Sequence, residues 1–235
     1  MNKIIECVPN FSEGRDFGKI AKIVGEIEKV KGVKLLNVES DADYNRTVVT
    51  FAGKPEAVRD AAFYAIEMAA EVIDMSHHKG AHPRIGATDV CPFVPVSDAT
   101  IDECVQIART LGKEVGEWLG IPVYLYGEAA VIPERHILPD IRKGEYEGLP
   151  EKLKDEKWRP DYGPVEFNEN VRRTGATVIG AREFLIAYNV NLDTQDIQIA
   201  NKISGIVRAS GVIQVNEKGE KVRVPGLLKC VQAMG

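Results

Sequence analysis

The sequence lacks a long uninterrupted hydrophobic run. No stretch of about eighteen apolar residues occurs among its 235 residues, so the sequence offers no candidate for a membrane-spanning helix. The first nine residues also lack the apolar core of a secretory signal peptide. We therefore expect a cytoplasmic protein without a membrane partner.

Cysteine and net positive charge are also scarce. The four cysteines are far apart and form no C-x-x-C pair, which argues against a disulfide framework or a zinc knuckle. The formal net charge is -5, and nucleic acid is an unsuitable partner because phosphate binding needs a basic face. An anionic small molecule remains compatible, since a local basic cluster can form on an acidic protein.

Residues 76–96 concentrate side chains that can take part in chemistry. They hold three of the four histidines, among a lysine, an arginine and two glycines. Pro83 restricts the backbone of His82 away from the helical region, and Gly80 and Gly86 flank the pair. Histidine is the commonest side chain that exchanges a proton near neutral pH. The pattern favours a shaped loop that presents His82 for proton transfer; an ordinary surface histidine in a turn is the alternative.

His78 and His82 are four residues apart, the spacing of a metal-binding pair on a helix. Gly80 and Pro83 would interrupt such a helix, and no glutamate follows His78 as it does in H-E-x-x-H. Asp89 is one source of a third ligand, but nothing in the sequence requires it. We predict no metal, and a metal-dependent hydrolase that uses the two histidines is a rival interpretation.

Two polar segments lie where strands are expected to meet other elements. Asn10, Ser12 and Arg15 precede a predicted helix, whose first backbone N–H groups attract anions, so these residues either hold a carboxylate or form an ordinary helix cap. Arg46 follows Asn45 at the start of a predicted strand. It is either a carboxylate clamp or a solvated residue at a strand edge.

Acidic residues crowd the end of another predicted strand. One of Glu39, Asp41 and Asp43 could orient a histidine or accept a proton from a substrate amine. The alternative is a solvated loop.

Hydrophobic periodicity predicts a β-α-β-β-α-β-α-β order in the first part of the chain. The expected strands are 4–8, 33–38, 46–51, 88–96 and 123–126, and the expected helices are 17–30, 57–74 and 100–119. This order is the ferredoxin-like split β-α-β arrangement with an extra helix and strand. We expect an α/β (α+β) fold with a mixed sheet and helices mainly on one face. Pro92 and Pro95 favour an edge or an irregular path for strand 88–96.

The second part of the sequence is expected to be incomplete. We expect a core subdomain at residues 1–130, a charged linker at 131–175 and a partial α/β subdomain at 176–235. The last region shows a strand-like stretch, a helix at 194–208, a short strand from 212 and the start of a further element at 221. So few elements cannot bury both faces of a sheet, so we expect this part to pack on the first part or on a second chain.

Several long motifs together resemble the formiminotransferase family. They are Glu6-Cys-Val-Pro-Asn-Phe-Ser-Glu-Gly14, Asn45-Arg-Thr-Val48, Asp74-Met-Ser-X-His-Lys-Gly-X-His-Pro-Arg84, Asp89-Val-Cys-Pro-Phe93, Val123-Tyr-Leu-Tyr-Gly-Glu-Ala-Ala130 and Gly180-Ala-Arg-X-Phe-Leu-Ile-Ala187. The resemblance covers essentially the whole chain. It implies two α/β subdomains with a folate-binding tunnel between them.

The resemblance also implies an activity and its site. The family transfers the formimino group of N-formimino-L-glutamate to N5 of tetrahydrofolate, a co-substrate, in histidine degradation and one-carbon metabolism. Its catalytic histidine falls on His82, and an assisting acid falls on Glu39, where the family often has Asp. Candidates for binding the substrate are Asn10, Ser12, Arg15, Asn45, Arg46, Lys79 and Arg84. The folate-contacting segment falls on Gly163, Pro164, Val165, Glu166, Phe167, Asn168, Glu169, Asn170, Val171 and Arg172.

Two departures from the family pattern leave alternatives open. A few extra residues separate Gly163-Pro164 from Gly175, and family members usually continue well beyond Gly235. A folate-binding or assembly subunit that needs a separate C-terminal fragment is therefore the alternative to an enzyme. We expect a homodimer or higher homo-oligomer, and the sequence leaves open whether the donor carries a formimino or a formyl group.

Overall fold

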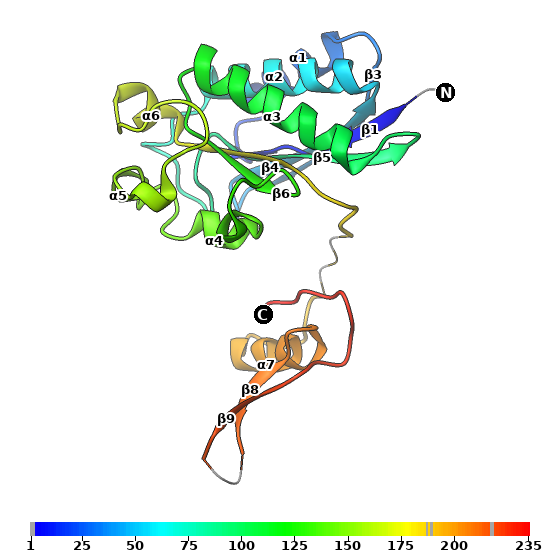
Figure 1. Ribbon diagram of the computed structural model, residues 1–235, viewed down its shortest axis with the longest axis vertical. Coiled ribbons are helices and arrows are strands. Elements are labelled where there is room, and N and C mark those ends of the chain that lie inside the picture. The colour runs from blue at the N-terminus through cyan, green and yellow to red at the C-terminus, as the bar shows by residue number, and fades with distance from the viewer. Residues whose placement is uncertain (1–2, 187, 189, 217–218) are drawn as a thin grey trace. The chain divides into compact units, whose positions relative to one another are not determined.

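The computed structural model describes residues 3–186, 188, 190–216 and 219–235. The chain divides into two compact units, Met1–Phe184 and Leu185–Gly235 (Figure 1), and each is described by itself.

The first unit is built on a mixed seven-stranded sheet. Its strands are β1 (Ile4–Cys7), β2 (Asn10–Phe11), β3 (Val33–Asp41), β4 (Arg46–Gly53), β5 (Thr88–Ser97), β6 (Val123–Gly127) and β7 (Thr177–Ala181). β3 pairs with β4, and β1 and β2 lie one after the other between β4 and β5. These pairs are antiparallel, whereas β7 lies parallel to both β5 and β6. The predicted α+β class with a mixed sheet is confirmed.

Three long helices cover one face of this sheet (Figure 1). They are α1 (Phe17–Lys29), α2 (Pro55–Val72) and α3 (Ile101–Trp118), close to the ranges that periodicity predicts. The Asp16 side chain caps α1 by accepting from the N–H groups of Gly18 and Lys19. Thr100 and Glu103 form a capping box at the start of α3. Local sequence signals thus set the helix starts.

Alternation along the strands builds a separate core on each face of the sheet. Cys91 and Phe93 of β5 belong to the large core with α1, α2 and α3. Val90, one residue earlier, packs in a smaller core with Tyr124 and Leu149 on the other face. β5 is therefore buried on both sides.

The expectation of an edge position for the strand with Pro92 and Pro95 is wrong. β5 lies inside the sheet, between β1 and β2 on one side and β7 on the other. The irregularity is present instead as a register shift between Ile4 and Ile5, and Ile5 lies opposite Pro95. A bulge lets an interior strand accommodate a residue that has no N–H to donate.

β7 differs from the expected division of the chain. The expected second subdomain covers residues 176–235, but β7 lies between β5 and β6 and completes the sheet of the first unit. The two compact units divide after Phe184. Parallel pairing needs no hairpin, so the local sequence gives no sign of this partnership.

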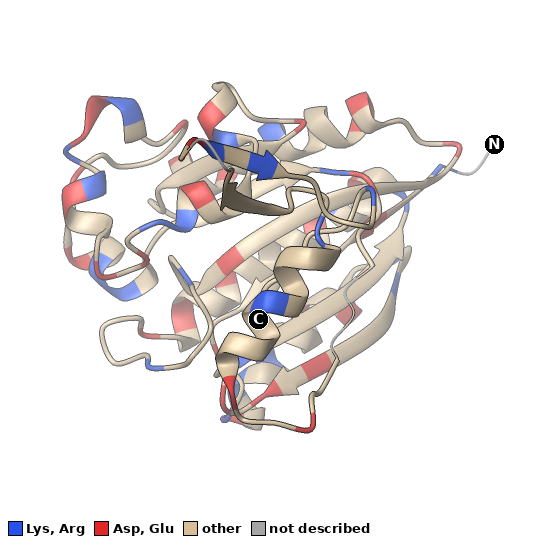
Figure 2. Ribbon diagram, turned by 90° about the horizontal axis from the view of Figure 1, so that it is seen from below, with Lys and Arg blue, Asp and Glu red and all other residues tan. Residues whose placement is uncertain are grey.

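The region expected to be a linker carries short helices that pack on the first unit. They are η1 (Pro133–Arg135), α4 (Leu138–Arg142), α5 (Leu149–Lys152), η2 (Glu156–Trp158) and α6 (Glu169–Thr174). Leu149 and Leu153 are buried in the smaller core, which anchors this region to the first unit. Basic and acidic positions are interspersed along the described chain (Figure 2), and local ion pairs such as Lys154–Glu151 join some of them.

The second unit consists of α7 (Ile197–Val207) and an antiparallel pair, β8 (Val212–Val215) and β9 (Lys221–Val224). Asp196 caps α7 through the N–H of Gln198. That this unit packs on the first unit or on a second chain stays a prediction. Among the described residues, no helix is both long and apolar enough to cross a membrane.

Candidate active site

The histidine loop joins α2 to β5 and is folded tightly against the β3–β4 turn. Asn45 Nδ2 donates to the Lys79 carbonyl at 3.0 Å, and the Ala81 N–H donates to the Asp43 carbonyl at 3.2 Å. A side chain at Gly80 would collide with the Tyr44 carbonyl, so glycine lets the two segments approach. The predicted shaped, non-helical loop is confirmed.

His82 points one ring nitrogen at a backbone carbonyl and the other at an arginine. Nδ1 lies 2.6 Å from the Pro83 carbonyl oxygen, which can only accept, so Nδ1 carries the hydrogen. Arg46 Nη1, which can only donate, contacts Nε2, so Nε2 bears the lone pair. Burial lowers the pKa of His82, and the positive charge of Arg46 lowers it further. The ring is therefore a neutral base at neutral pH.

The Arg46 guanidinium is largely buried and has no ion pair with a carboxylate among the described residues. Its Nε is shielded from solvent and has no hydrogen-bond partner among the described residues. Burial lowers its pKa to about 10, against the opposing effect of the Asp89 carboxylate. A buried donor without an acceptor is unfavourable, so this group is suited to an arriving anion.

Asp89 and Arg142 lie behind this pair. Asp89 at the start of β5 is only 2% exposed, and Arg142 of α4 donates to both of its carboxylate oxygens, with Nε at 3.2 Å from Oδ1. The same Oδ1 accepts the Ile85 N–H at 3.1 Å. The sequence did not point to Arg142, and it suggested Asp89 only as a metal ligand. The motif that begins at Asp89 and follows the histidine loop was the available signal for a role of Asp89 in the site.

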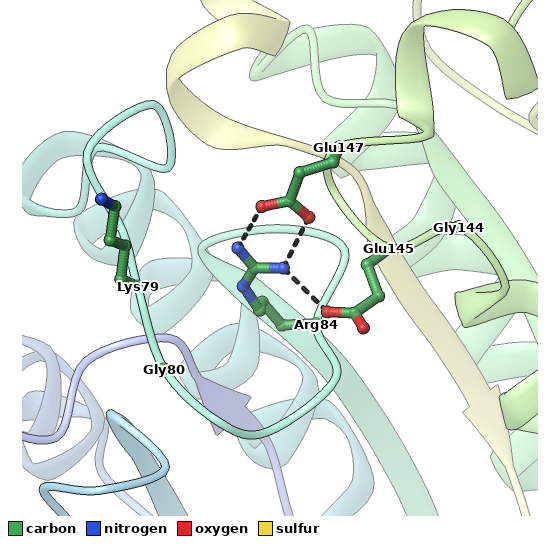
Figure 3. A pocket seen from close by; sticks show the side chains of 6 residues that line it. All are labelled: Lys79, Gly80, Arg84, Gly144, Glu145 and Glu147. Atoms are coloured by element: carbon green, nitrogen blue, oxygen red, sulfur yellow. Dashed lines mark hydrogen bonds and ion pairs between the residues drawn. The ribbon is translucent and has the colours of Figure 1, made fainter.

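Arg84 is occupied by acidic side chains. It donates to Glu147 at 2.6 and 2.8 Å and to Glu145 at 2.8 Å (Figure 3). These residues line a pocket of about 460 Å³ with Lys79, which no dashed line joins to them. The hydrogen bond from Arg84 holds the pKa of Glu147 below its usual range. A substrate carboxylate would have to displace these glutamates, so the predicted substrate role of Arg84 gains no support from this arrangement.

His78 has both ring nitrogens engaged. Nδ1 accepts from Arg84 Nε at 3.2 Å, and Nε2 donates to the Asn45 carbonyl at 3.0 Å. Burial lowers the pKa of His78, so the ring stays neutral. As arranged, it offers no free lone pair to pair with His82 on a metal. No group of three metal-binding side chains occurs among the described residues.

Three of the predicted substrate residues support the backbone around the loop. Asn10 donates to the Val8 carbonyl at 2.8 Å, and Ser12 donates to the Gly86 carbonyl at 2.7 Å. Asn45 Oδ1 accepts the Gly14 N–H at 2.9 Å. All three are buried. Their contact with substrate stays a prediction.

Arg15 and Glu39 are both exposed. Arg15 Nε donates to the Ala42 carbonyl at 2.7 Å, which holds its guanidinium beside the β3–β4 turn. Glu39 lies on β3 opposite Val48, two residues from Arg46 in β4, so Glu39 and Arg46 share one face of the sheet. The assisting role of Glu39 stays a prediction.

The predicted folate segment, Gly163 to Arg172, forms a turn and most of α6. Asn168 caps α6 through the Val171 N–H at 2.9 Å, and Asn170 donates to the Leu119 and Gly120 carbonyls at 2.9 Å. Glu169 and Arg172 form an ion pair at 2.6 Å. Val165 and Glu166 are exposed. The polar groups of α6 thus have structural partners, and their contact with folate stays a prediction.

The fold and this loop define an α/β protein with a neutral histidine beside an unneutralised arginine. Residues 4–182 match the formiminotransferase domain, N-terminal subdomain. The chain belongs to the formiminotransferase family.

Named relatives agree with this assignment. The chain is 48% identical to glutamate formimidoyltransferase of Streptococcus pyogenes serotype M1, over 90% of the chain and 70% of that protein. It is 53% identical to glutamate formimidoyltransferase of Thermoplasma acidophilum, over 88% of the chain and 67% of that protein. It is 48% identical over its whole length to mouse formimidoyltransferase-cyclodeaminase, of which it spans 41%.

Proposed function

We propose that the protein is a glutamate formimidoyltransferase. It would transfer the formimino group of N-formimino-L-glutamate to N5 of tetrahydrofolate, giving 5-formiminotetrahydrofolate and L-glutamate. Identities of 48% and 53% to two relatives of that name support the assignment. The observation that carries the chemistry is the neutral His82 ring, whose Nε2 lone pair is defined by its neighbours.

His82 would act first as a base and then as an acid. N5 of tetrahydrofolate attacks the formimino carbon, and the N5 proton passes to Nε2 of His82. The same proton then moves to the nitrogen of the departing glutamate, and the bond from that nitrogen to the formimino carbon breaks. Proton transfer by a positioned side chain typically contributes about 10²–10⁴-fold to the rate. Holding both substrates in register supplies a further acceleration.

Arg46 and Arg15 are the best-placed groups for the substrate carboxylates. Arg46 has donors to spare beside His82, and Arg15 is exposed with only its Nε engaged. Lys79 is exposed and remains available for a second carboxylate. Arg84 is the weakest candidate because Glu145 and Glu147 already neutralise it.

A coupled assay of this chain alone tests the proposal. Formiminoglutamate and tetrahydrofolate are supplied together, and formation of 5-formiminotetrahydrofolate is followed. We expect turnover, with formylglutamate run in parallel to establish the donor preference. A folded protein that binds folate but transfers no group would contradict the proposal.

The protein is further proposed to work in the cytoplasm as a homodimer or higher homo-oligomer. It would need no metal, nucleic acid or membrane. Metal analysis after purification without chelators tests the first of these points, and sedimentation equilibrium tests the oligomeric state.

A further inference from the structure

Arg46 differs from Arg84, Arg135 and Arg142 in having no ion pair with a carboxylate among the described residues, and it differs from Arg15, which also has none, in being largely buried. Arg84 has two glutamates, and Arg142 has Asp89. Arg135 has Asp161 and two backbone carbonyls. Among the described residues, Arg46 contacts only a ring nitrogen of His82, and its buried Nε, like that of Arg135, has no partner. This guanidinium therefore lacks the anion that Arg84, Arg135 and Arg142 have.

The atom that Arg46 contacts is the one that the proposed reaction needs. A base must offer its lone pair to the proton it removes, and in His82 that lone pair is on Nε2. While Arg46 Nη1 occupies Nε2, no substrate proton can reach it. In this structure, Arg46 therefore covers the lone pair of the base.

We propose that Arg46 is a substrate-released cap on His82: a carboxylate of the incoming donor draws the guanidinium away from Nε2 and so exposes the base. The inference rests on the proposed function and adds to it the coupling of donor binding to activation. The ligand class is a dicarboxylate, as in a formimino or formyl derivative of glutamate.

The exchange of partners is favourable for simple chemical reasons. The neutral imidazole accepts one hydrogen bond from Arg46, whereas a carboxylate can accept two from the same guanidinium and also neutralises its charge. The orphaned Nε can become one of those two donors. The Arg46 backbone is fixed opposite Asp41 in the β3–β4 ladder, so only the side chain needs to move.

Because the donor carboxylate releases Nε2 of His82, it contributes to the catalytic step as well as to binding. A formimino compound without a carboxylate would leave Arg46 on Nε2, and its turnover would fall together with its affinity. A group that contributed only uniform binding would change KM and leave kcat unaltered. Release of His82 by the donor carboxylate therefore discriminates between donors through kcat as well as through KM.

The pKa of His82 reports the position of the cap. The charged and titratable groups that face the ring are Arg46 from β4, Asp89 from β5, Arg142 from α4 and Tyr44 from the β3–β4 turn. Of these, Arg46 contacts Nε2 directly. Its departure toward a carboxylate should therefore raise the pKa of His82.

NMR titration of the four histidines tests this, with glutarate as a dicarboxylate probe that carries no transferable group. In the free protein we expect the pKa of His82 to lie below about 6.5 and to rise by roughly 1 pH unit at saturating glutarate. Arg46→Met should already show the higher value without glutarate and should show no further rise. Arg59→Met is the matched control, because Arg59 lies on α2 beside Asp60, and it should behave like the unaltered protein.

Three results would overturn the inference. They are saturable glutarate binding that leaves the His82 pKa unchanged, no saturable glutarate binding, and an Arg46→Met protein whose His82 titrates as before. The comparison with and without glutarate needs no variant, so a poorly folded variant does not affect it. A chain that transfers the formimino group but fails this titration would keep the proposed function and lose the cap.

Discussion

His78 and His82 lie on either side of Gly80, and both are neutral, but they have different roles. His78 uses both ring nitrogens to tie Arg84 to the Asn45 carbonyl, so it is part of the scaffold. His82 uses only Nδ1 in this way, and its Nε2 meets an arginine that can move. The same residue type, four positions apart, thus supplies a support and a base.

The depressed pKa of His82 has a consequence for the pH dependence of activity. The base form predominates above the pKa, so lowering the pKa extends activity toward acid. We expect the acid limb of kcat/KM, which reports the free enzyme, to have its midpoint below about 6.5. Initial rates between pH 5 and pH 8 measure it, with Arg59→Met as the control. A midpoint above that value would show that His82 is not the base or is not depressed.

His82 could be singled out from the sequence, but its partners could not. The proline and glycines around it are adjacent in the chain and constrain the loop by local geometry. Arg46 meets His82 from 36 residues away, and Glu147 reaches Arg84 from 63 residues away. Such contacts depend on how strands and loops assemble. The sequence therefore made Arg84 a candidate for binding a substrate carboxylate, whereas in the structure it already binds Glu145 and Glu147.

Among the elements, the junction of β5 with α4 is the most demanding electrostatically. Asp89 is almost fully buried, and Arg142 is its main ionic partner. A buried ion pair adds little to the free energy of unfolding compared with an apolar replacement. Removing one partner, however, leaves the other charge buried and uncompensated. The geometry of His82 and Arg46 depends on this junction because Asp89 and Arg142 face them both.

We expect Asp89→Asn to lower the free energy of unfolding by about 3–5 kcal/mol, the cost of leaving Arg142 buried without its countercharge. Chemical denaturation followed by circular dichroism measures it. Asp60→Asn is the matched control: Asp60 pairs with Arg59 but its side chain is 44% exposed, so the loss should stay below about 1 kcal/mol. Equal losses in the two variants would contradict the special role of the junction.

The helices were predictable and part of the sheet was not. Apolar spacing and caps at Asp16 and Thr100 are local signals, and α1, α2 and α3 follow them. β2 has only two residues, too few for a pattern. The position of β7 between β5 and β6 depends on parallel pairing between segments far apart in the chain.

The boundary between the two compact units follows the last strand of the large sheet. It does not coincide with the change in amino-acid composition before β7. β7 pairs with both β5 and β6, and every other strand of the large sheet lies before it in the chain. The charged region before β7 resembled a linker in the sequence because it is rich in proline and polar residues. Its buried leucines make it part of the first unit.

Truncation tests this division. A fragment of residues 1–184 should show a single cooperative thermal transition, because it holds the whole sheet and both of its cores. A fragment of residues 1–175 lacks β7 and should show no cooperative transition, since β5 and β6 lose their common partner. Calorimetry of the two fragments distinguishes them. Equally cooperative melting would place the boundary before β7.

The central claim is that His82 moves the proton between the two nitrogens of the formimino transfer. Single-turnover assays of the unaltered protein and of His82→Gln, with tetrahydrofolate affinity measured in parallel, test it most directly. We predict a loss of about 10²–10⁴-fold in rate with folate affinity nearly unchanged. A His82→Gln protein that transfers the formimino group at the unaltered rate would contradict the account.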